Sequence, residues 1–236
     1  MANFLSWKSK SLHWTFERHR APIFSSDIRD AQYFLGISLK NKRFSNDWIA
    51  EVLDGVGHLS GSAVIALVDT PYISTEETLS SGKMDLVRRL EVLQRQSEEN
   101  RERLQRLIRP YSSFVTMVSW SDLEKLKSLE IVIELNSAFK KSTRVRSLVL
   151  AQVQKVFSSS LAATEIEHLA KFFIEEIPTL ISIYYSAFDG IIDLYPGPQA
   201  DFFWELDSGA LQSDLPMATA LALSRCPHTY GSIIQK

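Results

Sequence analysis

The stretch Ala63–Val68, which reads AVIALV, decides the fold because it is apolar at every position. A strand with one face in water alternates apolar and polar residues. A continuous apolar run therefore indicates a strand that is covered on both faces, as in a parallel sheet. Three further stretches are predicted to be strands: 31–38 (AQYFLGIS), 114–120 (FVTMVSW) and 190–195 (GIIDLY).

Helical patterns separate these predicted strands. The segment 45–47 (SND) offers an N-cap for a first helix, and the longest helical stretch covers Lys83–Arg109, ahead of Pro110. Other helices are expected from residue 121, over 143–157 and over 162–174. The alternation predicts an α/β fold, a single Rossmann-like domain over residues 1–236 with a parallel sheet flanked by helices. Such sheets bind ligands at the carboxyl ends of their strands, here 36–38, 68–72 and 193–196.

The overall charge hides an uneven distribution. The 236 residues are 45% hydrophobic and 23% charged, which excludes a disordered chain. The formal net charge of −2 argues against a generic polyanion binder. However, the first 159 residues carry a net charge of +5 and the rest carry −7. This split suggests an anionic partner on one side of the molecule.

Several classes of protein have no support in the sequence. Cys226 is the single cysteine, so neither an intramolecular disulfide nor a cysteine-based zinc site is expected. The five histidines lack ligand spacing, which gives metal catalysis no support. No glycine-rich dinucleotide or phosphate loop is present, so no cofactor is implied. With no apolar stretch near 20 residues and no signal-peptide pattern, we expect a cytoplasmic protein that does not contact membranes.

Ser38 stands at the end of a predicted strand, two residues after Gly36. This arrangement is part of the nucleophile elbow of hydrolases, Gly-x-Ser-x-Gly, but Lys40 takes the place of the second glycine. Taken alone, the pattern favours a serine that simply ends a strand and caps a turn.

The predicted helix over Lys83–Arg109 is rich in arginine. On a helical wheel, most of the arginines share one face with acidic residues, while leucines occupy the opposite face. One interpretation is a solvated helix with charge pairs at i,i+4. The other is a stripe that contacts phosphates, with seven candidates: Arg88, Arg89, Arg95, Arg101, Arg103, Arg106 and Arg109.

Two glutamates interrupt an apolar helical stretch, KFFIEEIPTL over 171–180. One of Glu175 and Glu176 is expected to face partly inward, next to aromatic rings, where a carboxyl group is partly desolvated. Such a group could hold an ammonium or move a proton. The alternative is that both glutamates face solvent. Pro178 is expected to kink or end the helix.

Together these motifs resemble the cyclodipeptide synthases, which make a cyclic dipeptide from two aminoacyl-tRNAs. The family pattern is an apolar stretch that ends Gly-aliphatic-Ser, and much later Tyr-aliphatic-x-x-Glu-x-Pro. Here the first is Gly36-Ile37-Ser38 and the second runs over 172–178 (FFIEEIP), where Phe172 replaces the family tyrosine. The resemblance covers about residues 31–196 and implies a fold like the catalytic domain of class I tyrosyl-tRNA synthetases.

The resemblance also implies roles for particular residues. Ser38 would be the nucleophile, Glu176 would hold the aminoacyl amine, and Tyr195 would assist proton transfer or position the aminoacyl group. Four residues are expected to bind substrate: Gly36, Asn41, Phe172 and Asp69. The arginine-rich helix would bind tRNA, and the protein is expected to act as a monomer without a metal or cofactor.

Two subfamily markers are mixed in this chain. Asn41 matches an asparagine found in one branch of the family, whereas Tyr195-Pro196 matches the pair that marks the other, and we favour the Tyr-Pro branch. Two readings outside the family stay open. The partial elbow at Ser38 fits an α/β serine hydrolase, and the arginines fit a non-catalytic tRNA-binding module.

Overall fold

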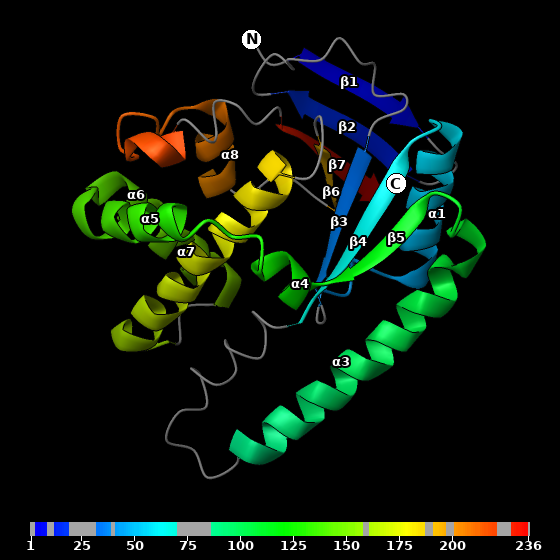
Figure 1. Cartoon of the computed structure of the whole chain (residues 1–236), viewed down its shortest axis with the longest axis horizontal. Helices are drawn as coiled ribbons and strands as arrows, with labels where there is room; N and C mark the ends of the chain where they lie inside the picture. Colours follow the sequence, from blue (N-terminus) through cyan, green and yellow to red (C-terminus); the bar gives the residue numbers. More distant parts are fainter. Residues whose placement is uncertain are drawn as a thin grey trace.

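The computed structural model describes residues 3–8, 12–18, 32–38, 41–69, 86–157, 161–186, 191–196, 201–220 and 228–235. Its centre is a seven-stranded sheet in the order β1-β2-β7-β6-β3-β4-β5 (Figure 1). The strands are β1 (Asn3–Lys8), β2 (Leu12–Arg18), β3 (Gln32–Ser38), β4 (Ser62–Val68), β5 (Val115–Ser119), β6 (Ile191–Tyr195) and β7 (His228–Gln235).

Five neighbouring strands, from β7 to β5, run parallel to one another. The four predicted strands are confirmed as β3, β4, β5 and β6, each within one residue of its expected ends. The predicted parallel sheet flanked by helices is confirmed over these five strands, and β1 and β2 add an antiparallel hairpin along β7 that was not predicted. The apolar residues of β2 alternate along the strand, which is the pattern of a strand with only one covered face.

One face of the sheet packs against α1 (Asn46–His58) and α3 (Leu86–Ile108). Alternate residues of β3 (Tyr33, Leu35 and Ile37) point into this core. The N-cap of α1 is Ser45, whose hydroxyl accepts a hydrogen bond from the amide of Trp48. From α3, Leu104 and Ile108 are buried in the same core, which explains why the leucine face of the helix turns inward.

The opposite face of the sheet packs against α4 (Trp120–Glu124) and part of α7 (Ala163–Ser186). A small cluster holds Phe34 of β3 and Ala66 of β4 against Trp120 of α4, with Leu180 of α7 beside them. The helix α4 begins one residue earlier than predicted, because the hydroxyl of Ser119 accepts the amide hydrogen of Asp122.

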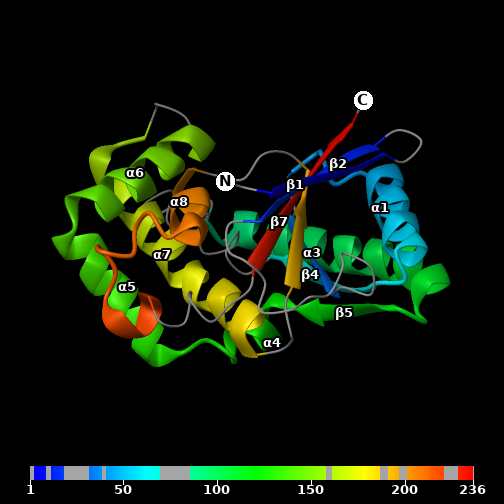
Figure 2. The same ribbon diagram turned by 90° about the horizontal axis from the view of Figure 1, so that it is seen from above.

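Beyond α7 lies a second group of helices, α5 (Leu129–Lys141), α6 (Thr143–Phe157) and α8 (Asp201–Ser208). Figure 2 shows α5, α6, α7 and α8 together on one side, with α1 and α3 on the other side near the sheet. These helices share their own apolar core, to which Leu135, Val149 and Phe202 contribute fully buried side chains. No helix in the described ranges is both long enough and apolar enough to cross a membrane.

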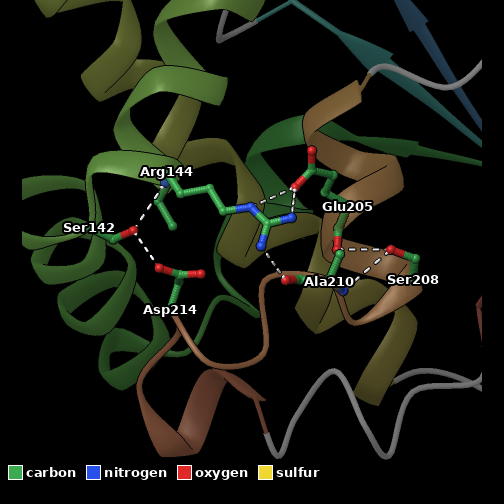
Figure 3. A network of polar contacts seen from close by, with 7 residues as sticks. Ser142, Arg144, Glu205, Ser208, Ala210 and Asp214 are labelled. Carbon is green, nitrogen blue, oxygen red and sulfur yellow. Dashed lines mark hydrogen bonds and ion pairs between the residues drawn. The ribbon is translucent and has the colours of Figure 1, made fainter.

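Polar contacts fasten the start of α6 to α8 and the turn after it (Figure 3). The guanidinium of Arg144 donates two hydrogen bonds to Oε2 of Glu205, at 3.1 and 2.7 Å, and a third to the carbonyl oxygen of Ala210 at 2.9 Å. The hydroxyl of Ser142 donates to Asp214 at 2.9 Å. The helical group is therefore held by charge-assisted bonds as well as by its apolar core.

The predicted helix over 162–174 was wrong at its C-terminal end, since α7 continues through Pro178 to Ser186, so the proline does not end the helix. Ile174, Ile177 and Ile181 are all buried around the proline. Burial of such side chains stabilises by about 1.5–3 kcal/mol each. This is comparable to the roughly 3 kcal/mol that an interior proline costs a helix.

Candidate active site

Ser38 is the last residue of β3 and lies opposite Val68 of β4 in the parallel register. Because side chains alternate along a strand, Gly36 and Ser38 project to the same face as Phe34, the face that α4 and α7 cover. A Cβ at Gly36 would lie 3.4 Å from a ring carbon of Phe34 and 3.5 Å from a methyl of Val68. A methyl group at this position would therefore be in van der Waals contact with Phe34 and Val68.

The segment after β3 is bonded to the end of β6. The amide Nδ2 of Asn41 donates to the hydroxyl oxygen of Tyr195 at 3.2 Å, and Nη1 of Arg43 donates to the carbonyl oxygen of Pro196 at 3.1 Å. The ring of Tyr195 also packs edge-on against Phe44, with 5.6 Å between ring centres. The strand ends that carry Ser38 and Tyr195 are thus joined, as the topology predicted. Asn41 and Tyr195, which match the markers of two different subfamilies, therefore contact each other directly.

Phe172, Glu176 and Leu180 form one stripe of α7, because each lies four residues after the one before. Leu180 packs on the cluster with Phe34 and Ala66. The neighbouring residues Ile174 and Ile177 face the other way, into the core of the helical group. The stripe therefore turns toward the sheet face from which Ser38 projects, and it includes the partly buried Phe172 one turn from Glu176.

The carboxyl group of Glu176 is strongly affected by its surroundings. Burial raises its pKa from 4.5 to about 8, and the negative charge of Glu124 adds to the rise. The prediction that one glutamate of the pair faces partly inward is confirmed, and that residue is Glu176. At neutral pH the carboxyl group is therefore mostly protonated when no substrate ammonium is near.

Glu124 was not singled out in the sequence. It lies on α4, four residues after Trp120, whose ring is in the cluster with Leu180. Only the packing of α4 against α7 brings the two glutamates near each other. The indole Nε1 of Trp120 and the hydroxyl of Thr179 are buried and have no hydrogen-bond partner among the described residues.

Asp69, a predicted substrate-binding residue, follows β4 and is buried at 7% exposure. Its Oδ2 accepts a hydrogen bond of 2.5 Å from the hydroxyl of Ser97, and Nη2 of Arg101 lies 3.4 Å from the same oxygen. Both partners come from α3, so Asp69 faces this helix. The rest of the predicted strand end, residues 70–72, lies outside the described residues.

The arginines of α3 differ in their surroundings. Arg95 and Arg106 are exposed and lie near Glu99 and Glu102 of the same helix, at 3.8 and 3.6 Å. Arg103 instead is half-buried, and its Nη1 donates to Asn46 of α1 at 2.6 Å. Arg88, Arg101 and Arg109 are exposed, and the side chain of Arg89 lies outside the described part. The solvated-face interpretation thus fits two arginines, and Arg103 has a structural contact.

No three residues of the metal-ligating types come together as a possible metal site in the ranges that the structure describes. Ser38 and Tyr195 end the neighbouring parallel strands β3 and β6, and Asn41 is bonded to Tyr195, while Glu176 lies on α7 and is affected by the charge of Glu124. The fold and this site define a Rossmann-like α/β protein with a candidate serine nucleophile.

Comparison with known proteins narrows this class. No protein-family model and no curated protein matches the amino-acid sequence. Solved structures do match. A cyclodipeptide synthase (CDPS) from Staphylococcus haemolyticus superposes with a TM-score of 0.66 at 12% identity, covering 94% of this chain and 100% of that one. The cyclodipeptide synthase AlbC from Streptomyces noursei superposes with a TM-score of 0.57 at 15% identity, over 88% and 96% of the two chains.

A third structure, the Mycobacterium tuberculosis protein Rv2275, superposes with a TM-score of 0.62 at 12% identity. It covers 98% of this chain and 96% of that one, and it was described as relating cyclodipeptide synthetases to type I tRNA synthetases. The chain therefore has the fold of the cyclodipeptide synthases, which confirms the resemblance found in the sequence.

Proposed function

We propose that this chain is a cyclodipeptide synthase, an aminoacyltransferase that forms a cyclic dipeptide from two aminoacyl-tRNAs. The observation that carries the proposal is the likeness of fold over 94% of the chain, combined with Ser38, Glu176 and Tyr195 at the positions that match the family pattern. An aminoacyl-tRNA is already an activated ester, so the reaction needs no ATP site. The proposed location is the cytoplasm, where aminoacyl-tRNAs are made.

In the first step, the hydroxyl oxygen of Ser38 attacks the ester carbon of one aminoacyl-tRNA. The bond between that carbon and the ribose oxygen breaks, and the tRNA leaves with a proton on this oxygen. The product is an aminoacyl ester of Ser38.

Glu176 is suited to control the proton of the aminoacyl amine. The pKa of its carboxyl group, about 8, is close to the usual value of an α-amino group, roughly 7.7–8.0. A carboxylate holds the ammonium form by an ion pair, and transfer of one proton to it frees the amine for attack. Because the two pKa values match, neither protonation state is strongly favoured, and this transfer costs little free energy.

The remaining steps use the same groups. The freed amine of the aminoacyl-Ser38 ester attacks the ester of a second aminoacyl-tRNA, which gives a dipeptidyl-enzyme and releases the second tRNA. The terminal amine of the dipeptide then attacks the Ser38 ester, closes the ring and returns the proton to the serine oxygen. Tyr195, placed by Asn41, assists proton transfer or positions the aminoacyl group, and Asn41 orients the second substrate. Phe172 contributes an apolar surface near Glu176, without the hydroxyl of the family tyrosine.

The test has two parts. Expression in a bacterium, followed by mass spectrometry of the medium, should detect cyclic dipeptides and identify the amino acids used. Mixing the purified protein with charged tRNA should raise its intact mass by one aminoacyl residue. Ser38→Ala should show no such adduct, whereas the exposed Ser113→Ala should retain it. Absence of an adduct on the wild-type protein, or an equal adduct on Ser38→Ala, would contradict the proposal.

A further inference from the structure

Asp69 contacts the arginine-bearing helix at a defined point. Its Oδ2 accepts a hydrogen bond of 2.5 Å from the hydroxyl of Ser97 and one of 3.4 Å from Nη2 of Arg101. Asp69 and Ser97 are both buried, at 7% and 6% exposure, whereas about half of the Arg101 side chain stays in solvent. One end of the guanidinium is thus fixed by a buried acceptor, and the remaining N–H donors are accessible.

The position of this contact in the sheet places it near the candidate nucleophile. Ser38 pairs with Val68, and Asp69 is the next residue along the chain after Val68. Paired strands lie about 4.8 Å apart, so the backbone of Asp69 lies within roughly two residue lengths of Ser38. Figure 1 shows α3 as a long helix that passes the ends of β4 and β5.

Other arginines of α3 lack such an anchor. Arg95 and Arg106 pair with glutamates of their own helix, at exposed positions where such pairs contribute little. Arg103 bonds to Asn46 of α1. In the described part of the chain, Arg101 is the arginine of α3 that contacts a residue at a strand end, Asp69 after β4.

The chemistry of the substrate gives this position a meaning. The ester that Ser38 would attack is on the terminal ribose of the tRNA, so the last phosphates of the tRNA lie within a nucleotide or two of the serine. Arginine is suited to phosphate because its planar guanidinium donates several parallel hydrogen bonds. A guanidinium that is already held in place loses less conformational entropy when it binds.

We propose that Asp69 and Ser97 are positioning residues that hold Arg101 at the sheet edge that also carries Ser38, where Arg101 contacts a phosphate near the 3′ end of the aminoacyl-tRNA. This inference rests on the proposed function and gives Asp69 a role other than binding the aminoacyl group. It also predicts that removing a negative charge, that of Asp69, weakens the binding of tRNA. By charge alone, neutralising Asp69 would tighten the binding of tRNA, whereas loss of positioning weakens it.

The test measures the affinity of uncharged tRNA for the wild-type protein, Asp69→Asn, Arg101→Ala and the double variant. Each single variant is expected to bind about tenfold more weakly, the loss typical of one well-placed arginine contact with nucleic acid. The double variant should bind no more weakly than Arg101→Ala, because Asp69 acts through that arginine. With a tRNA that lacks its three 3′-terminal nucleotides, none of these substitutions should change the affinity.

Arg95 provides a matched control on the same helix. The effects of Asp69→Asn and Arg95→Ala should simply add, since the two residues are not in contact. Ser97→Ala removes a single hydroxyl and should weaken binding in the same direction as Asp69→Asn. It serves as the second variant if thermal melting shows that Asp69→Asn is unfolded.

Three results would overturn the inference: tighter binding by Asp69→Asn, additive effects of Asp69→Asn and Arg101→Ala, or equal effects with the truncated tRNA. Unchanged affinity for uncharged tRNA, with loss of product only, would instead return Asp69 to the aminoacyl site. Product formation by the wild-type protein is measured separately. If it forms product while the inference fails, the proposed function stands, and if it neither binds tRNA nor forms product, both are wrong.

Discussion

The amide of Asn41 donates a hydrogen bond of 3.2 Å to the hydroxyl oxygen of Tyr195, a residue 154 positions away in the chain. This bond joins the segment after β3 to the last residue of β6. A tyrosine hydroxyl that accepts one hydrogen bond keeps its own proton available to donate. The geometry therefore leaves the hydroxyl of Tyr195 able to donate its own proton.

Tyr195→Phe should remove this hydroxyl and keep the ring against Phe44. A positioned acid or base usually contributes at least about 10²-fold to the rate, so we expect product formation to fall by at least about tenfold. The free energy of unfolding should fall by about 1 kcal/mol. Cyclic dipeptide yield and thermal melting are the measurements. The matched control is Tyr111→Phe. It removes a hydroxyl bonded to Asp54 at 3.0 Å, and it lies before the start of β5, away from the carboxyl ends of the strands. Wild-type turnover by Tyr195→Phe would exclude a role for this hydroxyl.

Glu176 should make the stability of the fold depend on pH. Its folded pKa, about 8, exceeds the ordinary value of 4.5. Between these two values the folded state binds more protons than the unfolded state. Stability is therefore lost as pH rises through this window. The penalty on the charged form reaches on the order of 5 kcal/mol above pH 8. Glu176→Gln, which is neutral at every pH, should unfold at a higher temperature than the wild type at pH 8.5.

At pH 4.5 the same two proteins should have nearly equal melting temperatures, because both side chains are then neutral. Glu175→Gln is the control, since it removes the adjacent carboxyl group and leaves Glu176 in place. It should keep the wild-type difference between the two pH values. If Glu176→Gln has no stabilising effect at pH 8.5, the carboxyl group is not desolvated as described. Despite its greater stability, this variant is expected to form little product, because glutamine cannot take a proton from the amine.

The strands were predictable where the sequence is apolar without interruption. The run 63–68 is covered on both faces, and composition alone shows this. The strands β1, β2 and β7 were missed, because their polar positions resemble those of loops. At Pro178 the local rule gave the wrong helix end, because apolar packing on both sides of the proline outweighs the missing hydrogen bond.

The site was predictable in part, for a similar reason. Short motifs mark Ser38, Glu176 and Tyr195 as separate candidates. The parallel order of the strands indicates that the carboxyl ends of β3 and β6, which carry Ser38 and Tyr195, lie at the same edge of the sheet. The contacts between elements leave no local signal. Ser97 bonds to a residue 28 positions away, and Glu124 affects Glu176 only through the packing of α4 on α7. These pairs become visible only when the helices are placed.

Arg144→Ala should destabilise the helical group that Figure 3 shows. The substitution removes three hydrogen bonds, two to Glu205 and one to the carbonyl oxygen of Ala210. Because about half of the side chain is exposed, we expect a loss of about 1–2 kcal/mol. Chemical denaturation measures it. Lys155→Ala on the same helix is the control, since its pair with Asp201 is long, 3.6 Å, and exposed. Equal effects of the two substitutions would show that the Arg144 network contributes no more than a surface pair.

Glu124→Gln should lower the pKa of Glu176. The charge of Glu124 is the second cause of the raised pKa, after burial, so its removal favours the ionised form of Glu176. Carboxyl carbon NMR, titrated against pH, measures the change directly. Glu130→Gln, an exposed position on α5, is the control and should leave the titration of Glu176 unchanged.

The same substitution should also change catalysis in a defined way. A Glu176 carboxylate of lower pKa still binds the substrate ammonium but accepts its proton less readily. The rate of aminoacyl transfer to the second substrate should therefore fall, while formation of the aminoacyl-Ser38 ester, which needs no proton on Glu176, stays near the wild-type rate. Single-turnover measurements with charged tRNA separate the two steps. If both steps slow equally, Glu124 supports the fold of the site rather than the proton balance at Glu176.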